Sequence, residues 1–323
     1  MNKFFLVILF FSLLNFQLSA QNLLPINIAH RGASGYLPEH TLAAKALAYG
    51  QGADYIEQDI VLTADDIPII IHDIHLDTVT DVARKFPERK RKDGRFYALD
   101  FTLAEIKTLQ VNERIDLKTG LPVFPKRFPL YKSEFRISTL AEELEMIQGL
   151  NKSTGKDIGI YPEIKEPEWH RKEGHDISKI VLFILNEFGY KTKEDKCYLQ
   201  CFDAKELKRI RAELKSELAL VQLLEEDTDL NEVAKYADGI GPSIKQIITE
   251  IKPDGKPVIS DMVKLAHQKD LVVHPYTFRV DSLPFSLDSD KLLNVLFKKI
   301  KIDGIFSDFP DVTAKFLKKK FKK

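Results

Sequence analysis

The chain has 323 residues, 44% of them hydrophobic, and its 48 Lys and Arg residues equal its 48 Asp and Glu residues in number. A chain without net charge has no electrostatic basis for nonspecific binding to nucleic acid, so we expect no nucleic-acid partner. The length allows one barrel-sized domain or two smaller ones.

Residues 1–20 have the pattern of a secretory signal peptide. Lys3 precedes an apolar run over 4–14, and the small residues Ser19 and Ala20 follow. The apolar run is shorter than the roughly 20 residues that span a bilayer, which disfavours the alternative of an uncleaved membrane anchor. We expect cleavage after Ala20, a mature domain over 21–323 and no stable membrane insertion.

Short apolar runs alternate with amphipathic segments along the rest of the chain. The runs predict strands at 26–30, 54–62, 159–165, 196–202, 218–224, 238–242, 271–275 and 303–307. The amphipathic segments predict helices at 41–49, 140–149, 177–188, 204–217, 231–236, 262–269 and 292–299. This alternation favours an α/β fold, a (β/α)8 or TIM barrel, and an open doubly wound sheet is the alternative.

The segment 60–71 is predicted as a β-hairpin, because it is too short for a crossover helix between parallel strands. With Asp65 and Asp66 as its two central turn residues, Asp59 lies opposite His72. Cβ atoms of opposite residues are about 5 Å apart, so the hairpin would return His72 to the end of the second strand. A slip of one residue would spoil this register.

Polar residues collect at the predicted strand ends, where TIM barrels carry their active sites. Glu57 and Asp59 lie two positions apart and share one face of a strand, where two buried carboxylates would repel each other. Glu163 from the third strand completes a set of three carboxylates, which suits calcium or magnesium better than zinc. The alternative is a salt-bridge network with Arg31 and Lys165.

His30 and His72 lie at predicted strand ends beside these charged residues. An imidazole exchanges protons near neutral pH, so we interpret the two histidines as an acid/base pair rather than as structural residues. Arg31 and Lys165 carry charges that could neutralise phosphoryl oxygens. The alternative for both cations is pairing with the carboxylates.

Cys197 and Cys201 lie four positions apart in a predicted strand. They would be roughly 13 Å apart, beyond the reach of a disulfide. We therefore expect two buried thiols.

Several motifs together carry a resemblance that extends over 23–318. They are HRGASGYLPEHTLAAKALAYGQGADYIEQDIVLTADD, IIIHD, TDVARKFPERKRKDGR, STGKDIGIYPEIK, YLQCFDAKELKRI, YADGIGP, LVVHPYTFR and GIFSDFPD. In this order they resemble the glycerophosphodiester phosphodiesterase family of bacteria, in its periplasmic branch.

The resemblance implies a TIM barrel of the phospholipase C-like phosphodiesterase type, with an inserted cap segment at 75–135. It also implies one divalent cation, calcium first and magnesium as the alternative. The site roles that it implies are metal ligation by Glu57, Asp59 and Glu163, acid/base catalysis by His30 and His72, and phosphate contact by Arg31 and Lys165. Aromatic residues are core by default, but Phe202 and Tyr276 lie at predicted strand ends, where they could line the glycerol pocket. Many relatives have asparagine at the position of His40, whose role is left open.

The implied reaction is hydrolysis of glycerophosphocholine, glycerophosphoethanolamine and similar diesters to sn-glycerol 3-phosphate and an alcohol, in glycerol and phospholipid-breakdown metabolism. One histidine would deprotonate the glycerol 2-hydroxyl, which attacks phosphorus, and the other would protonate the departing alcohol. Water would then open the cyclic phosphate. A barrel phospholipase that acts on intact lipid and a secreted binding protein are the alternatives, and a homodimer is compatible with the sequence.

The basic run at 84–95 lies within the expected insert. Charge runs usually face solvent, so we expect a solvated loop, with a role in holding acidic substrates as the alternative.

Overall fold

The computed structural model describes residues 24–225, 228–285 and 287–321. The predicted signal peptide at 1–20 lies outside these residues. Among the helices within the described ranges, none is both long and apolar enough to cross a membrane.

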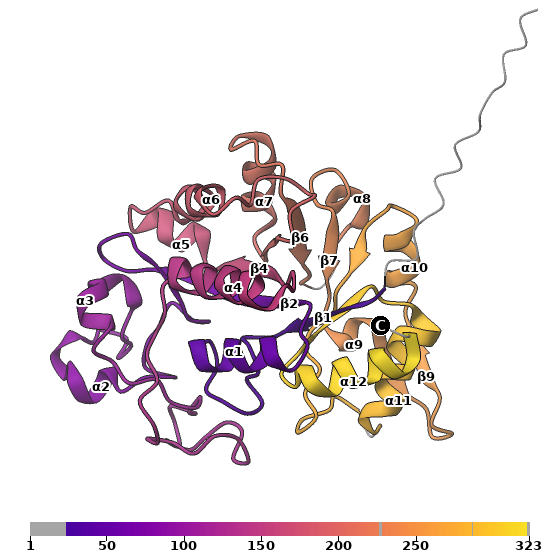
Figure 1. The fold of residues 1–323 in the computed structure, drawn as a ribbon, viewed down its shortest axis with the longest axis horizontal. Helices are drawn as coiled ribbons and strands as arrows, with labels where there is room; N and C mark the ends of the chain where they lie inside the picture. The colour runs from indigo at the N-terminus through magenta and orange to yellow at the C-terminus, as the bar shows by residue number, and fades with distance from the viewer. Residues whose placement is uncertain (1–23, 226–227, 286, 322–323) are drawn as a thin grey trace, which may run out of the picture.

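Eight parallel strands of the described chain form a barrel (Figure 1). Their order, each bonded to the next, is β10 (Val272–Val273), β7 (Gly239–Gly241), β6 (Ala219–Leu223), β5 (Tyr198–Cys201), β4 (Gly159–Ile164), β2 (Tyr55–Leu62), β1 (Ile26–Ala29) and β11 (Gly304–Ser307). Backbone bonds close the circle, since the Asp303 amide donates to the Val273 carbonyl at 3.1 Å and the Phe306 amide to the Pro275 carbonyl at 3.0 Å. The predicted TIM barrel is confirmed, and each predicted run contains one of these strands.

Helices surround the strands (Figure 1). Those expected from the sequence are α1 (Leu42–Gly50), α4 (Leu140–Thr154), α6 (Ile177–Glu187), α7 (Ala204–Ala212), α8 (Leu230–Val233), α10 (Met262–His267) and α11 (Ser289–Asn294), which the π-helical turn η3 (Val295–Ile300) continues. A capping box of Thr139 and Glu142 begins α4. That helix passes the predicted end at Gly149 and stops at Gly155, whose φ of 70° ends it in the left-handed conformation.

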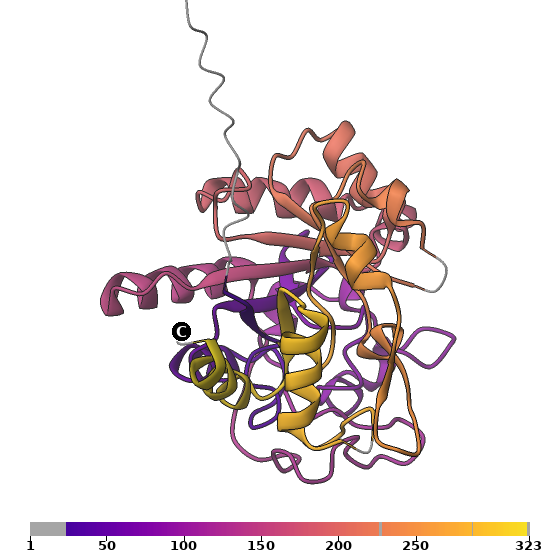
Figure 2. The ribbon, with the colours of Figure 1, turned by 90° about the vertical axis from the view of Figure 1, so that its right-hand side faces the viewer.

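Other elements extend the barrel. They are α5 (Pro167–Lys172), α9 (Ile244–Ile247), the β8 (Ile248–Ile251) and β9 (Pro257–Ile259) hairpin, and α12 (Pro310–Phe321). Helix α12 packs on β1 and on α11, and the two yellow helices are side by side in both Figure 1 and Figure 2.

The barrel interior is filled by large side chains. Ile28, Tyr161, Val221 and Phe306 form one buried cluster. The rings of Tyr161 and Phe306 meet edge to face at 4.9 Å between centroids. This packed centre leaves the strand ends as the place for a site.

The predicted hairpin is present, but its predicted register is wrong by one residue. Strand β3 (Pro68–Ile70) pairs antiparallel with β2, and the Ile71 amide donates to the Asp59 carbonyl at 2.9 Å. Asp59 therefore lies opposite Ile71 and not opposite His72. The loop has three residues rather than two, because the Thr63 amide bonds to the Ile67 carbonyl at 3.1 Å.

Asp66 explains this loop length. Its φ of 58° is left-handed, which is the conformation that closes a three-residue hairpin loop after a type I turn. Aspartate tolerates this conformation better than most residues. His72 follows the hairpin and still reaches the site described below.

The segment at 75–135 contains short helical pieces, seen in purple at the left of Figure 1. They are α2 (Val82–Lys85), η1 (Pro87–Arg89), η2 (Ala98–Asp100) and α3 (Leu103–Ile106). Leu76, Phe101 and Ile106 form a second small core with Ile69 and Ile71, which flank the end of the hairpin. The segment is thus anchored on β3.

The basic run at 84–95 is mostly exposed to solvent, as predicted, but three of its arginines are half-buried in ion pairs. Arg89 bonds to Glu105 at 2.9 Å, Arg91 to Asp100 at 2.7 Å and Arg95 to Asp77 at 2.7 Å. These carboxylates belong to the same segment, so the charges hold it together. The two cysteines are buried and unpaired, as expected.

Candidate active site

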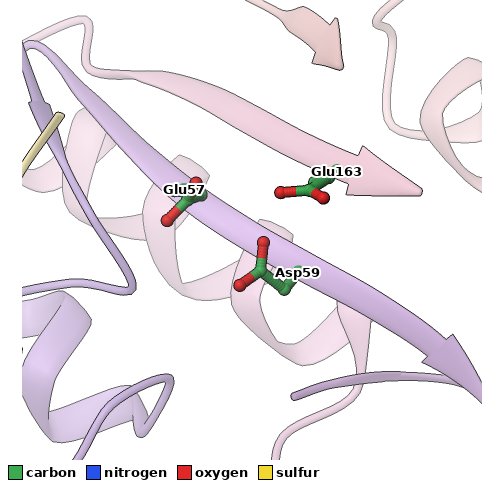
Figure 3. A group of neighbouring side chains, drawn as sticks. All are labelled: Glu57, Asp59 and Glu163. Carbon is green, nitrogen blue, oxygen red and sulfur yellow. The ribbon is translucent and has the colours of Figure 1, made fainter. Parts of the chain in front are cut away.

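Three carboxylates meet at the strand ends of β2 and β4. Asp59 and Glu163 are register partners on these neighbouring strands, and Glu57 lies two positions before Asp59 on the same face. One oxygen from each residue lies within 4.8 Å of the others, and all three residues are buried. Figure 3 shows the three side chains converging between the strands.

Burial and mutual repulsion shift the pKa values of this carboxylate triad. Burial and the nearby Asp59 raise the pKa of Glu57 well above its ordinary value, and burial raises that of Glu163 to about 7 although Lys165 opposes the shift. Burial would also raise the pKa of Asp59, but His40 and Lys165 lower it well below its ordinary value. Asp59 therefore remains ionised while its two neighbours resist ionisation.

The triad fits a divalent cation. Asp59 Oδ1 is buried and has no hydrogen-bond partner within the described part of the chain. The alternative salt bridges are also present, with Lys165 Nζ at 2.6 Å from Glu163 Oε1 and Arg31 Nε at 3.6 Å from Asp59 Oδ2. Arg31 also pairs with Glu39, which Arg114 binds as well, so Arg31 and Lys165 do not neutralise all three carboxylates of the triad. The remaining negative charge and the oxygen-only donors suit calcium or magnesium.

His40, whose role the sequence left open, holds one carboxylate of the triad. It is buried with a φ of 62°, and its Nε2 lies 2.7 Å from Asp59 Oδ2. Burial lowers the pKa of His40 to about 3, so the imidazole is neutral at physiological pH. A neutral imidazole that donates from Nε2 orients the Asp59 carboxylate.

We expect cation binding to the triad to weaken as the pH falls below about 7. The pKa of Glu163 is about 7, so a proton competes with the cation below that value, and each displaced proton costs up to about tenfold in affinity per pH unit. Calorimetric titration in two buffers of different ionisation enthalpy measures the released protons. Equal heats in both buffers with a constant affinity from about pH 6 to 8 would contradict this linkage.

His30 and His72 are each held by an aspartate. His30 Nδ1 lies 2.6 Å from Asp308 Oδ1, and His72 Nδ1 lies 2.5 Å from Asp73 Oδ1. Burial lowers the pKa of each histidine to about 4. With Nδ1 donating to the aspartate, Nε2 of each neutral ring carries the lone pair that can accept a proton.

The Nε2 atoms face the charged groups of the site. His30 Nε2 lies 4.0 Å from Glu57 Oε2, and His72 Nε2 lies 3.4 Å from Lys165 Nζ. Eight of the nine predicted site residues line one cavity of about 200 Å³, and Phe202 and Tyr276 meet edge to face on its wall.

Lys165, the ninth predicted residue, lines an adjoining cavity of about 470 Å³. The two cavities share Glu163, Phe202 and Leu223. The predicted side chains therefore line two adjoining cavities.

Sequence reasoning assigned no role to the groups that hold these residues. Asp308 and Asp73 hold the histidines. Asp308 directly follows β11, which is a signal that the sequence offered, whereas Asp73 lies three residues beyond β3. Gln200, near the end of β5, donates a hydrogen bond from Nε2 to Glu57 Oε1 at 3.1 Å. Arg114 and Arg127 bind the two aspartates from the segment at 75–135, where no periodic pattern points to them.

The model of the glycerophosphoryl diester phosphodiesterase family matches residues 30–312. The chain belongs to this family. The glycerophosphodiester phosphodiesterase of Haemophilus influenzae is 48% identical and covers 91% of this chain and 90% of its own length. The enzyme of the same name from Treponema pallidum is 40% identical over 90% of this chain and 91% of its own. The family and the enzyme class predicted from the motifs are confirmed.

Solved structures share the fold. A phosphodiesterase from Oleispira antarctica in complex with the product sn-glycerol-3-phosphate has a TM-score of 0.65 at 22% identity, covering 91% of this chain and 97% of its own. A glycerophosphodiester phosphodiesterase from Agrobacterium tumefaciens has a TM-score of 0.60 at 21% identity, and the match covers 89% of this chain and 98% of its own. At this identity they support the barrel architecture alone.

Proposed function

We propose that this phosphodiesterase hydrolyses glycerophosphodiesters to sn-glycerol 3-phosphate and an alcohol by histidine acid/base catalysis. The observation that carries the proposal is the pairing of two aspartate-held histidines with a carboxylate triad and a guanidinium in one cavity of about 200 Å³. The relatives from Haemophilus influenzae and Treponema pallidum support the substrate class.

One histidine accepts the proton of the glycerol 2-hydroxyl as that oxygen attacks phosphorus. The bond from phosphorus to the alcohol oxygen breaks, and the other histidine gives that oxygen a proton. The negative phosphate of the substrate raises the pKa of a neighbouring imidazole. The histidine that acts as the acid is thereby protonated when substrate binds. Water then opens the cyclic phosphate with the two roles reversed. Because nucleophile and phosphorus belong to one molecule, the first step is intramolecular.

Arg31 and Lys165 are suited to hold the phosphoryl oxygens. Lys165 lies 3.4 Å from His72 Nε2, so a phosphate at this lysine is within reach of that histidine. A divalent cation held by Glu57, Asp59 and Glu163 would add positive charge beside the phosphate and the attacking hydroxyl. We propose calcium, with magnesium as the alternative, because both prefer carboxylate oxygens.

The cavity of about 470 Å³ offers room for the alcohol portion of the substrate. Glu166, Asp203 and Glu225 lie on its wall. Carboxylates favour cationic groups, which supports glycerophosphocholine and glycerophosphoethanolamine as substrates. We also propose a periplasmic location from the pattern of residues 1–20, and a homodimer stays a prediction.

The test is product analysis with two matched substrates. With glycerophosphocholine we expect sn-glycerol 3-phosphate and choline in equal amounts. The analogue that lacks the 2-hydroxyl should not be cleaved, because it has no internal nucleophile. Cleavage of both at similar rates would refute the cyclic route, and choline release from intact phosphatidylcholine vesicles alone would favour the phospholipase alternative.

A further inference from the structure

The segment at 75–135 sends one arginine to each of the two histidine–aspartate pairs. Arg127 Nη2 donates to Asp308 Oδ2 at 2.7 Å, while the other oxygen of that carboxylate binds His30. Arg114 Nη1 donates to Asp73 Oδ2 at 2.7 Å, while the other oxygen binds His72. The two arrangements have the same order, from arginine to carboxylate to imidazole.

Arg127 is a rigid support for Asp308. Its side chain is only 4% exposed, whereas that of Arg91 in the same segment is 31% exposed. The Nε and Nη2 atoms of Arg127 donate hydrogen bonds to the Asp281 carboxylate at 2.8 and 3.1 Å. The Arg127 guanidinium also lies 3.7 Å from the centre of the Phe124 ring. Arg279 gives Asp308 Oδ2 a second contact at 3.0 Å.

Arg114 connects two parts of the site. Besides Asp73, it binds Glu39 through Nη2 at 2.6 Å and Nε at 3.1 Å. Glu39 in turn accepts a hydrogen bond from Arg31 Nη1 at 3.0 Å. Arg114 therefore supports both the aspartate behind His72 and the arginine proposed to hold phosphate.

A carboxylate that is bound at both oxygens cannot rotate freely. Its fixed oxygen sets the ring orientation of the histidine and the nitrogen that carries the proton. Without the arginine, each carboxylate would lose a charge-assisted bond and the imidazole would be held less firmly in one direction.

We propose that Arg114 and Arg127 are positioning residues, through which the segment at 75–135 completes both acid/base pairs of the barrel. This inference rests on the proposed function, since it assigns the arginines a role through His30 and His72. It gives the segment a part in turnover.

The test compares Arg114→Gln and Arg127→Gln with the matched control Arg95→Gln. Arg95 also forms a two-bond pair in the segment, with Asp77, but contacts neither histidine–aspartate pair. We expect kcat to fall about 10- to 100-fold in both test variants and to stay unchanged in the control. KM should stay constant in Arg127→Gln and rise in Arg114→Gln, which also loses the support of Arg31.

Arg127→Lys and Arg114→Lys keep the charge and should recover part of kcat, and they replace the Gln variants if those do not fold. Circular dichroism and thermal unfolding confirm the fold of each variant. Wild-type kcat in the Arg114 and Arg127 variants, or an equal loss in Arg95→Gln, would overturn the inference. If His30→Ala and His72→Ala also keep full activity, the proposed function itself fails, so the two failures are distinguishable.

Discussion

Replacing His30 or His72 with alanine is expected to lower kcat for glycerophosphocholine by about 10²- to 10⁴-fold, the usual contribution of a general acid or base. Each ring lines the cavity and its Nδ1 bonds to one aspartate, so its removal should leave the barrel core unchanged. Steady-state kinetics, with circular dichroism to confirm folding, measure the effect.

His267→Ala is the matched control for these variants. His267 also bonds to an aspartate, with its Nε2 2.8 Å from Asp303 Oδ2, but it lies on α10 outside both cavities. We expect its turnover to equal that of the wild type. Full activity in either His30→Ala or His72→Ala would contradict the assignment of the acid/base pair.

Removing a carboxylate of the triad is expected to weaken cation binding before it affects the fold. Asp59→Asn should have the largest effect, because Asp59 is the member that remains ionised. Glu163→Gln should weaken binding by at least about 10- to 100-fold, the range seen even for residues that only support metal ligands. Calorimetric titration with calcium and with magnesium measures both affinities.

Turnover at high cation concentration separates this effect from that of the histidines. Excess calcium should restore much of the activity of Glu163→Gln, because two ligands remain. It should not restore His30→Ala. A Glu163→Gln protein that binds calcium as tightly as the wild type would exclude Glu163 as a ligand.

The barrel could be predicted from the sequence because its buried parallel strands are largely apolar runs that alternate with amphipathic helical segments. All six residues of β4 and all five of β6 are buried, as expected for a sheet covered on both faces. The same logic found the triad, since Asp59 and Glu163 had to lie at the same end of neighbouring parallel strands.

The hairpin register could not be predicted in the same way. It depended on whether Asp66 adopts a left-handed conformation, and an Asp-Asp pair does not specify a loop length as Asn-Gly or Asp-Gly does. His72 reached the predicted site in spite of this error because it follows the paired strand and Asp73 fixes its ring.

The arginines of the segment at 75–135 were beyond sequence reasoning for a different reason. Arg114 and Arg127 act on Asp73 and Asp308, which are 41 and 181 positions away along the chain. The segment has only short helices, so no periodicity shows which side chains point to the barrel. The positions of Arg114 and Arg127 are set by ion pairs and by the small second core, and these contacts exist only in the folded protein.

The most direct test of the central claim is turnover of glycerophosphocholine after removal of all divalent cations by a chelator, followed by addition of calcium or magnesium alone. We expect release of sn-glycerol 3-phosphate to stop without cation and to return with calcium. In His30→Ala the same addition should restore nothing. Full turnover in the cation-free protein would contradict the account of the triad as a metal site that serves the two histidines.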